Sequence, residues 1–288
     1  MTELIIAPFA DFDFMRRALV GCLALALGAT PIGVFLLLRR MSLMGDAMSH
    51  AILPGAALGY LAFGLSLGAI TLGGIVAGLV VVFAAGFVAR SSILQEDASL
   101  AAFYLMSLAA GVLIVSLRGQ NLDLLHVLFG SVLSLDDGSL QLIAAITSFT
   151  LLALAVLYRP LVLECCDPAF LRSVGRWSPV AHYGFLTLVV LNLVSGFHAL
   201  GTLMAVGIMI LPAAAARLWA QRLSRILAAA VVIAFFSGFI GLLASFHFDV
   251  PAGPAVVLTA GLAYLASILL APGGALGARL YRRHHLEA

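Results

Sequence analysis

Residues 18–38 read ALVGCLALALGATPIGVFLLL, a run in which no side chain carries a charge. A helix needs about 20 apolar residues to cross the roughly 30 Å of hydrocarbon in a bilayer. Lipid offers no partners to free backbone N–H and C=O groups, so such a run is stable in a membrane only as a helix that satisfies them internally. This stretch is therefore predicted to be a transmembrane helix.

The same pattern repeats along the chain and sets the fold class. Of the 288 residues, 63% are hydrophobic and 10% are charged, whereas a soluble domain has about 25% charged residues. We predict an all-α, polytopic membrane protein that forms a single domain over 1–288, with about eight to nine transmembrane helices. A further apolar stretch, 124–135, is too short to cross and is predicted to be re-entrant or interfacial. The predicted spans lie near residues 18–38, 43–63, 66–89, 98–117, 139–157, 180–196, 199–216, 226–246 and 252–271.

The ends of the chain and its arginines predict an orientation. Residues 1–17 mix acidic, basic and phenylalanine side chains, which is not a signal-peptide pattern. The mixture suits an amphipathic segment that lies on the outer face of the membrane that the chain spans. Cytoplasmic loops hold an excess of Arg and Lys. The chain has no lysine, and most of its arginines are cytoplasmic if the N-terminus is outside. The tail 272–288 is then cytoplasmic. The net charge of +2 reflects this topology and gives no reason to expect a nucleic-acid partner.

One long hydrophilic connection, 159–179, interrupts the spans. Asp167 is placed to cap a short helix that has Pro168 at its first position and Gly175 at its end. Such a helix is either an amphipathic linker that rests on lipid headgroups or a docking helix for a soluble partner, and the residues alone leave both readings open. It would expose three apolar side chains on the cytoplasmic side, Phe170, Leu171 and Val174.

Polar side chains inside a span are the candidates for function. An ionised group at mid-membrane costs at least about 2.5–3.5 kcal/mol, so it usually faces a cavity, a pathway or a partner. Asp46 and His50 are four residues apart in the predicted span 43–63, which puts them on one helical face. A carboxylate with an imidazole suits a borderline divalent ion such as Zn²⁺ or Mn²⁺. Two ligands are not a full set, so another helix, a second copy of the chain or water would complete it. The alternative is an Asp–His hydrogen bond that only joins two helices.

Other polar residues are weaker candidates. His126, in the short apolar stretch, and His198 and His247, at outer span ends, are possible metal contacts. His182 is predicted at headgroup depth, and the acidic pair Glu96 and Asp97 is explained by the positive end of a helix dipole. The three cysteines lack the spacing of a thiolate metal site. The sequence has no nucleotide-binding loop and no zinc-protease signature, so any ATP hydrolysis must come from another subunit.

A family resemblance rests on residues 39–55, RRMSLMGDAMSHAILPG. This block resembles the signature of the zinc/manganese/iron permeases of ABC transporters. Shorter motifs agree with that family in order, and the match covers the chain from about Phe14 to Leu270. One departure is Met48, where the family commonly has leucine; both are apolar and similar in size. The shorter motifs are EDAS at 96–99, LFG at 128–130, GTLM at 201–204, ILPAAAAR at 210–217 and VPAGPA at 250–255.

The resemblance implies a homodimeric permease of the bacterial inner membrane with the packing of cobalamin-type importers. Two ATP-binding subunits would dock on its cytoplasmic face, and a metal-binding receptor would deliver the ion outside. Asp46 and His50 match the residues implicated in metal passage, and the loop around Asp167 matches the coupling helix. The cargo would be Zn²⁺, Mn²⁺ or Fe²⁺, with no permanently bound cofactor, and zinc is slightly favoured by its affinity order over manganese. The coupling residues implied are Glu164, Asp167, Pro168, Phe170, Leu171 and Gly175.

Three alternatives stay open at this point. The first is a stand-alone secondary metal transporter, which the docking loop argues against. The second is a membrane-embedded metalloenzyme, which the two-ligand site and the missing catalytic signatures disfavour. The third is an ABC permease for a metal chelate or a non-metal cargo, which a wide apolar cavity without convergent ligands would favour.

Overall fold

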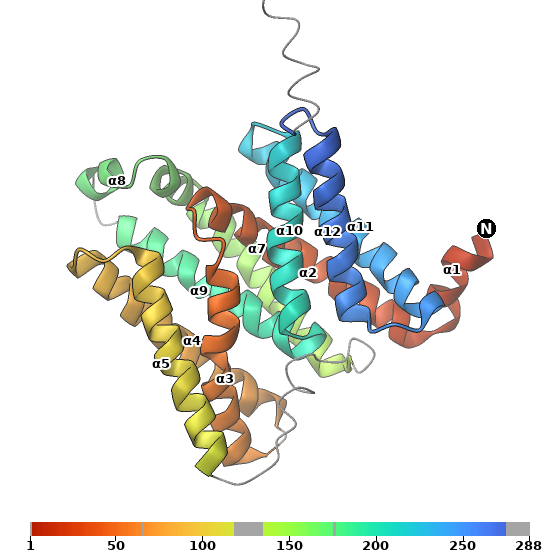
Figure 1. Cartoon of the computed structure of the whole chain (residues 1–288), viewed down its shortest axis with the longest axis horizontal. Coiled ribbons are helices and arrows are strands. Elements are labelled where there is room, and N and C mark those ends of the chain that lie inside the picture. Colours follow the sequence, from red (N-terminus) through yellow and green to blue (C-terminus); the bar gives the residue numbers. More distant parts are fainter. Residues whose placement is uncertain (1, 65, 118–134, 175–176, 275–288) are drawn as a thin grey trace, which may run out of the picture.

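The computed structural model describes residues 2–64, 66–117, 135–174 and 177–274, and these ranges consist of helices and their short connections (Figure 1). The helices are α1 (Thr2–Asp11), α2 (Asp13–Leu38), α3 (Met44–Phe63), α4 (Leu67–Ser91), α5 (Glu96–Leu117), α7 (Asp137–Cys166), α8 (Pro168–Val174), α9 (Trp177–Leu200), α10 (Thr202–Trp219), α11 (Leu223–Phe248) and α12 (Ala252–Leu270). The all-α prediction is confirmed for this part of the chain.

Each of the nine predicted spans coincides with one long helix. Within the described ranges, eight helices are long and apolar enough to cross a membrane: α2, α4, α5, α7, α9, α10, α11 and α12. The exception among the long helices is α3, which has 20 residues but begins with the polar stretch that contains Asp46 and His50. The predicted re-entrant stretch lies outside the described residues except for Leu135, which is buried.

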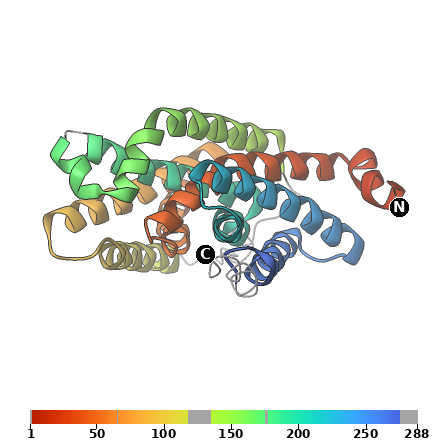
Figure 2. The same cartoon turned by 90° about the horizontal axis from the view of Figure 1, so that it is seen from above.

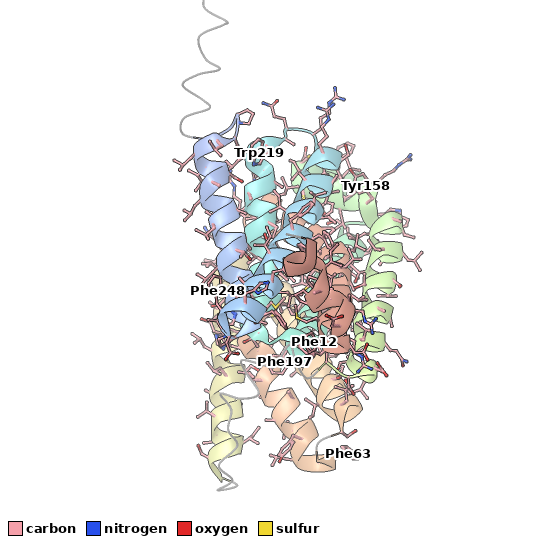
Figure 3. All side chains as sticks on the ribbon, turned by 90° about the vertical axis from the view of Figure 1, so that its right-hand side faces the viewer. Phe12, Phe63, Tyr158, Phe197, Trp219 and Phe248 are labelled. Atoms are coloured by element: carbon pink, nitrogen blue, oxygen red, sulfur yellow. The ribbon has the colours of Figure 1, made fainter. Side chains whose placement is uncertain are left out.

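The helices form two groups joined by α9. Helices α3, α4 and α5 pack on one another, while α10, α11 and α12 pack together with α2. Helix α9 contacts α4 and α3 on one side and α7, α10 and α2 on the other, and it lies between the two groups in Figures 1 and 2. Figure 3 places Tyr158 and Trp219 towards one end of the bundle and Phe12, Phe63 and Phe197 towards the other.

Two predicted boundaries need correction. The outer segment 1–17 is not one unit, because α2 already begins at Asp13 and only α1 precedes it. The connection 159–179 is also shorter than predicted, because α7 continues through Pro160 to Cys166. Leu161 and Glu164 are both buried, so their packing holds the last turns in a helix despite the proline. At its other end, hydrogen bonds from the hydroxyl and backbone N–H of Ser139 to Asp136 cap α7 and lower the pKa of that carboxyl.

Helices α3 and α4 touch through their backbones. A Cβ atom at Gly55 would fall on the carbonyl group of Gly73, and a Cβ atom at Gly73 would fall on that of Gly55. Gly59 stands equally close to the carbonyl of Ala69. Small residues at such crossings let membrane helices gain van der Waals contact at short range, since burial from water is not available to drive them together.

We expect Gly55→Ala to destabilise the bundle, because the added methyl group collides with main-chain atoms. Overpacking of this kind costs about 1–3 kcal/mol. Gly261→Ala in α12 is the matched control, since nothing lies within 4 Å of a Cβ atom there. The measurement is the midpoint of thermal unfolding in detergent. Gly55→Ala should lower the midpoint, and Gly261→Ala should leave it unchanged or raise it. A wild-type midpoint in Gly55→Ala would show that α3 and α4 can move apart there at no cost.

Candidate metal site and docking segment

A tight corner between α2 and α3 sets the position of the candidate metal ligands. The backbone N–H of Arg40 donates to the Leu37 carbonyl at 3.2 Å, and that of Met41 donates to the Leu36 carbonyl at 2.9 Å. Arg40 has a φ of 60°, in the left-handed region that residues with a side chain rarely adopt. Met41 is buried in the core. Two hydrogen bonds and the buried Met41 therefore hold the corner and offset the strain at Arg40.

Asp46 and His50 lie on the face of α3 that points away from the core. Met44, Met48 and Ile52 are almost fully buried on the opposite face. The Asp46 side chain is exposed and that of His50 is half-buried. The predicted shared face is thus present, and the described residues of this chain leave it uncovered. Neither side chain hydrogen-bonds to the other or to another helix in the described part of the chain, which gives no support to the alternative of a hydrogen bond that joins two helices.

A small hollow adjoins Asp46 but not His50. It measures about 190 Å³ and lies between the start of α3 and the start of α5. Asp97 and Tyr104 of α5 line it together with Asp46. Among the residues that the structure describes, no group of three or more His, Cys, Asp or Glu side chains is placed to hold a metal ion. The metal site therefore stays a prediction of two ligands that need further ones from elsewhere.

Of the three weaker histidine candidates, His247 is the one whose side chain the structure describes, and it does not join this pair. His126 lies outside the described residues, and so does the side chain of His198 in the last turn of α9. His247 is exposed in the last turn of α11 and packs edge-on against the ring of Phe246 at 5.5 Å. Helices α4 and α5 are the main neighbours of α3, with smaller contributions from α9 and α10, and α11 is outside this set.

The predicted docking helix is present as α8. The Asp167 carboxylate accepts a hydrogen bond from the backbone N–H of Phe170 at 2.9 Å, and Pro168 is the first residue of the helix. The helix ends at Val174, next to Gly175, which lies outside the described residues. Phe170 is 51% exposed, as predicted. Leu171 is not: it is 5% exposed and packs into the main core. The side chain of Val174 lies outside the described residues, so Phe170 is the exposed large apolar side chain among those that the structure describes on α8.

Glu164 is a second residue of the predicted coupling set that faces inward. It is 4% exposed, and its carboxylate accepts hydrogen bonds from Arg90 Nη2 at 3.2 Å and from the Ser178 hydroxyl at 3.3 Å. Arg90 Nη2 also lies 3.4 Å from the Ser178 carbonyl and hydroxyl oxygens. Arg90 stands in the last turn of α4, so it joins the end of α7 to the start of α9.

Beside it lies a group of charged residues that sequence reasoning did not connect. Arg39 Nη2 donates to His182 Nδ1 at 2.6 Å, and His182 Nε2 lies 3.2 Å from Glu96 Oε1. The Arg39 guanidinium also stacks over the Phe185 ring, 5.1 Å from its centre. His182 is 3% exposed, so it is packed among protein side chains, and its headgroup depth stays a prediction. Glu96 does begin α5, as the helix-dipole argument assumed, but its carboxylate also lies 3.9 Å from Arg39, which follows α2, and 3.2 Å from His182 of α9.

Comparisons with known proteins identify the class of protein. The sequence matches the ABC 3 transport family over residues 11–271. The manganese import system permease protein ScaB of Streptococcus gordonii is 32% identical over 273 residues, which cover 94% of this chain and 96% of that protein. The chelated iron transport system membrane protein YfeD of Yersinia pestis is 30% identical over 267 residues, which cover 93% of this chain and 88% of that protein.

Solved structures agree with the sequence comparisons. PsaBC from Streptococcus pneumoniae in complex with Fab matches with a TM-score of 0.83 at 29% sequence identity, over 98% of this chain and 99% of that chain. An inward-facing conformation of a metal-chelate type ABC transporter matches with a TM-score of 0.64 at 17% identity, over 88% of this chain and 85% of that chain, and shows a shared fold. The protein is thus an ABC permease, a multi-pass membrane subunit and not an enzyme. The chain belongs to the ABC 3 transport family, which confirms the resemblance seen in residues 39–55.

Proposed function

We propose that the chain is the permease subunit of an ATP-driven importer for a divalent transition metal, with manganese as the first cargo to test. The observation that carries this proposal is the uncovered face of α3 that holds Asp46 and His50. Relatives named for manganese and for iron support a metal cargo, whereas the names of these relatives give no support to the slight preference for zinc drawn from affinity order.

The incomplete ligand set supports a homodimer. Two copies of the chain, each presenting an Asp46 and a His50, would supply four ligands to one ion in a pathway between them. Four protein ligands would fill the coordination sphere of zinc, and water would complete the octahedral sphere that suits Mn²⁺. Lipid cannot satisfy the Asp46 carboxylate at any depth within the hydrocarbon, which favours a protein or water-filled surface opposite it.

The remaining parts follow from the proposed importer. ATP-binding subunits dock on α8, with Phe170 as the apolar contact, and a metal-binding receptor releases the ion at the opposite face. The N-terminus lies outside and the C-terminus in the cytoplasm of a bacterial inner membrane, as the arginine distribution favours. ATP binding and hydrolysis then open the pathway alternately to each side, and the ion passes Asp46 and His50 between the two states.

The test is uptake of radiolabelled Mn²⁺, Fe²⁺ and Zn²⁺ into proteoliposomes that contain the permease with its ATPase and receptor. We expect ATP-dependent uptake of Mn²⁺, with Zn²⁺ transported less. A parallel preparation without the ATPase separates an importer from a secondary transporter, because uptake there would contradict the proposal. Absence of uptake of every ion in the complete system would contradict a free-ion cargo.

A second candidate cargo is a metal chelate. An apolar hollow of about 720 Å³ lies between α3, α4 and α5, lined by Leu58, Val76 and Met106 among others. A space of this size and chemistry suits an organic ligand better than a bare ion. One relative is named for chelated iron transport. Uptake of the chelated metal but not of the free ion, in the same proteoliposomes, would favour this candidate over the first.

A further inference from the structure

The titratable residues near α8 form one group, which we call the charge cluster: Arg39, Arg90, Glu96, Glu164 and His182. They line a single cavity of about 500 Å³. Four helices contribute, α4, α5, α7 and α9, together with Arg39, which follows the last residue of α2. None of the five residues was expected to meet another from the sequence. Glu164 and His182 are almost fully buried and the other three are half-buried, and titratable side chains in such places are usually paired.

One half of the charge cluster holds the base of α8. This helix stands between the end of α7 and the start of α9, and Arg90 binds Glu164 on the first and Ser178 on the second. The Ser178 hydroxyl donates to the same Glu164 oxygen. A force applied to α8 therefore reaches Arg90 through both of its flanking helices. Leu171 adds an apolar anchor beneath the helix.

The other half of the charge cluster reaches the candidate metal site. His182 follows Ser178 by four residues on α9, so both stand on one face of that helix. His182 contacts Arg39, which begins the strained corner before α3, and Glu96, which begins α5. Asp97, the next residue, lines the hollow that also contains Asp46. Both elements that border this hollow are thus joined to α9 by charged contacts.

Buried pairs of this kind respond in steps rather than smoothly. Removing one partner leaves a charge without compensation in a poorly solvated site, so each pair tends to be either made or broken. A packed interior likewise switches between discrete arrangements instead of deforming continuously. A movement of α8 would then displace the α2–α3 corner and the start of α5, because the contacts between these elements do not deform gradually.

We propose that the charge cluster transmits the movement of α8 to the Asp46 hollow, with Arg39 and Arg90 as positioning residues. This inference rests on the proposed function, because it requires an ATPase on α8 and an ion at Asp46. It assigns a role to residues that touch neither. Arg90 and Glu164 keep the two ends of the docking segment together, and Arg39 and His182 link that segment to the corner that places Asp46.

The experiment measures metal uptake and phosphate release in the same proteoliposomes, with the complete transporter. Arg90→Gln should keep the ATPase bound and hydrolysing but lower the metal transported per ATP roughly tenfold, within the range usual for coupling between sites. Arg39→Gln should act in the same direction. The exchange Arg90→Glu with Glu164→Arg should restore most of the ratio. Arg225→Gln, an exposed arginine on α11 outside the charge cluster, is the matched control and should keep the wild-type ratio.

Each outcome decides something. An unchanged ratio in Arg90→Gln would overturn the inference, as would an exchange variant that assembles normally but recovers nothing. If Arg90→Gln does not assemble, Glu164→Gln removes the same charge pair from its other side, and a wild-type ratio in that variant would also overturn the inference. Failure of the proposed function is distinct, because the wild-type transporter itself would then take up no metal.

A readout that needs no cargo completes the test. Spin labels at Ser173 on α8 and at Leu43 before α3, both exposed, report the distance between the docking helix and the corner. The native cysteines are replaced beforehand. ATP binding should shift this distance in the wild-type background and not in Arg90→Gln. An equal shift in both would overturn the inference even if uptake were lost.

Discussion

Asp46→Ala is expected to reduce ATP-dependent metal uptake to the background level of vesicles without the transporter, while the permease still assembles with its ATPase. The side chain is exposed and makes no side-chain hydrogen bond in the described part of the chain, so its removal costs the fold little. An ion in the pathway would lose a charged ligand, and hard divalent ions depend on such oxygen donors. His50→Ala should act in the same direction, with an effect that depends on the ion.

Two controls separate ligand loss from damage to the helix. Asp46→Asn keeps the size of the side chain and removes its charge, so it should be almost as defective as Asp46→Ala. Asp249→Asn changes another exposed aspartate, at the end of α11, and should transport normally. Uptake of radiolabelled Mn²⁺ and ATPase co-purification are measured for each variant. Normal uptake by Asp46→Ala would remove the residue from the pathway, and failure to assemble would make its role structural.

Phe170→Ala is expected to weaken binding of the ATPase subunit and, through this, to abolish ATP-driven transport. An exposed aromatic side chain on a short capped helix is typical of an interface hot spot, where truncation costs 2 kcal/mol or more, about a thirtyfold loss of affinity. Asp167→Ala should have a smaller effect in the same direction, because loss of a helix cap costs about 1 kcal/mol.

The measurement for Phe170→Ala is co-purification of the ATPase and its affinity for the permease in detergent. Phe248→Ala is the control: it removes a ring that is 76% exposed, at the end of α11. This result is also distinct from that expected of Arg90→Gln, which should keep the ATPase bound and lose only the coupling. Normal ATPase affinity in Phe170→Ala would place the docking contact elsewhere.

The sequence was sufficient for features that depend on neighbours along the chain. The nine long helices were predicted from apolar runs, and the cap of α8 from Asp167 and Pro168 standing side by side. The shared face of Asp46 and His50 follows from their spacing. Whether that face is covered could not be predicted, because it depends on how α5 packs and on what stands beside the chain.

Features that depend on distant residues were missed for a physical reason. Arg90 and Glu164 are 74 positions apart, and Arg39 and His182 are 143 apart, so nothing local indicates that they meet. Arginines near span ends were assigned to topology alone, which fits their charge but not their burial. The inward orientation of Leu171 and the extension of α7 past Pro160 likewise result from packing against other helices.

The backbone contact at Gly55 and Gly73 determines how α3 can move. Because main-chain atoms of α3 and α4 meet there, neither helix can slide or roll past the other without a collision. The two helices therefore move as one rigid body. The Arg40 corner is at one end of α3, and Phe63 is at the other. A small rotation at the corner becomes a wide sweep at the far end. One pivot would thus suffice to close the pathway on one side of Asp46 while opening it on the other.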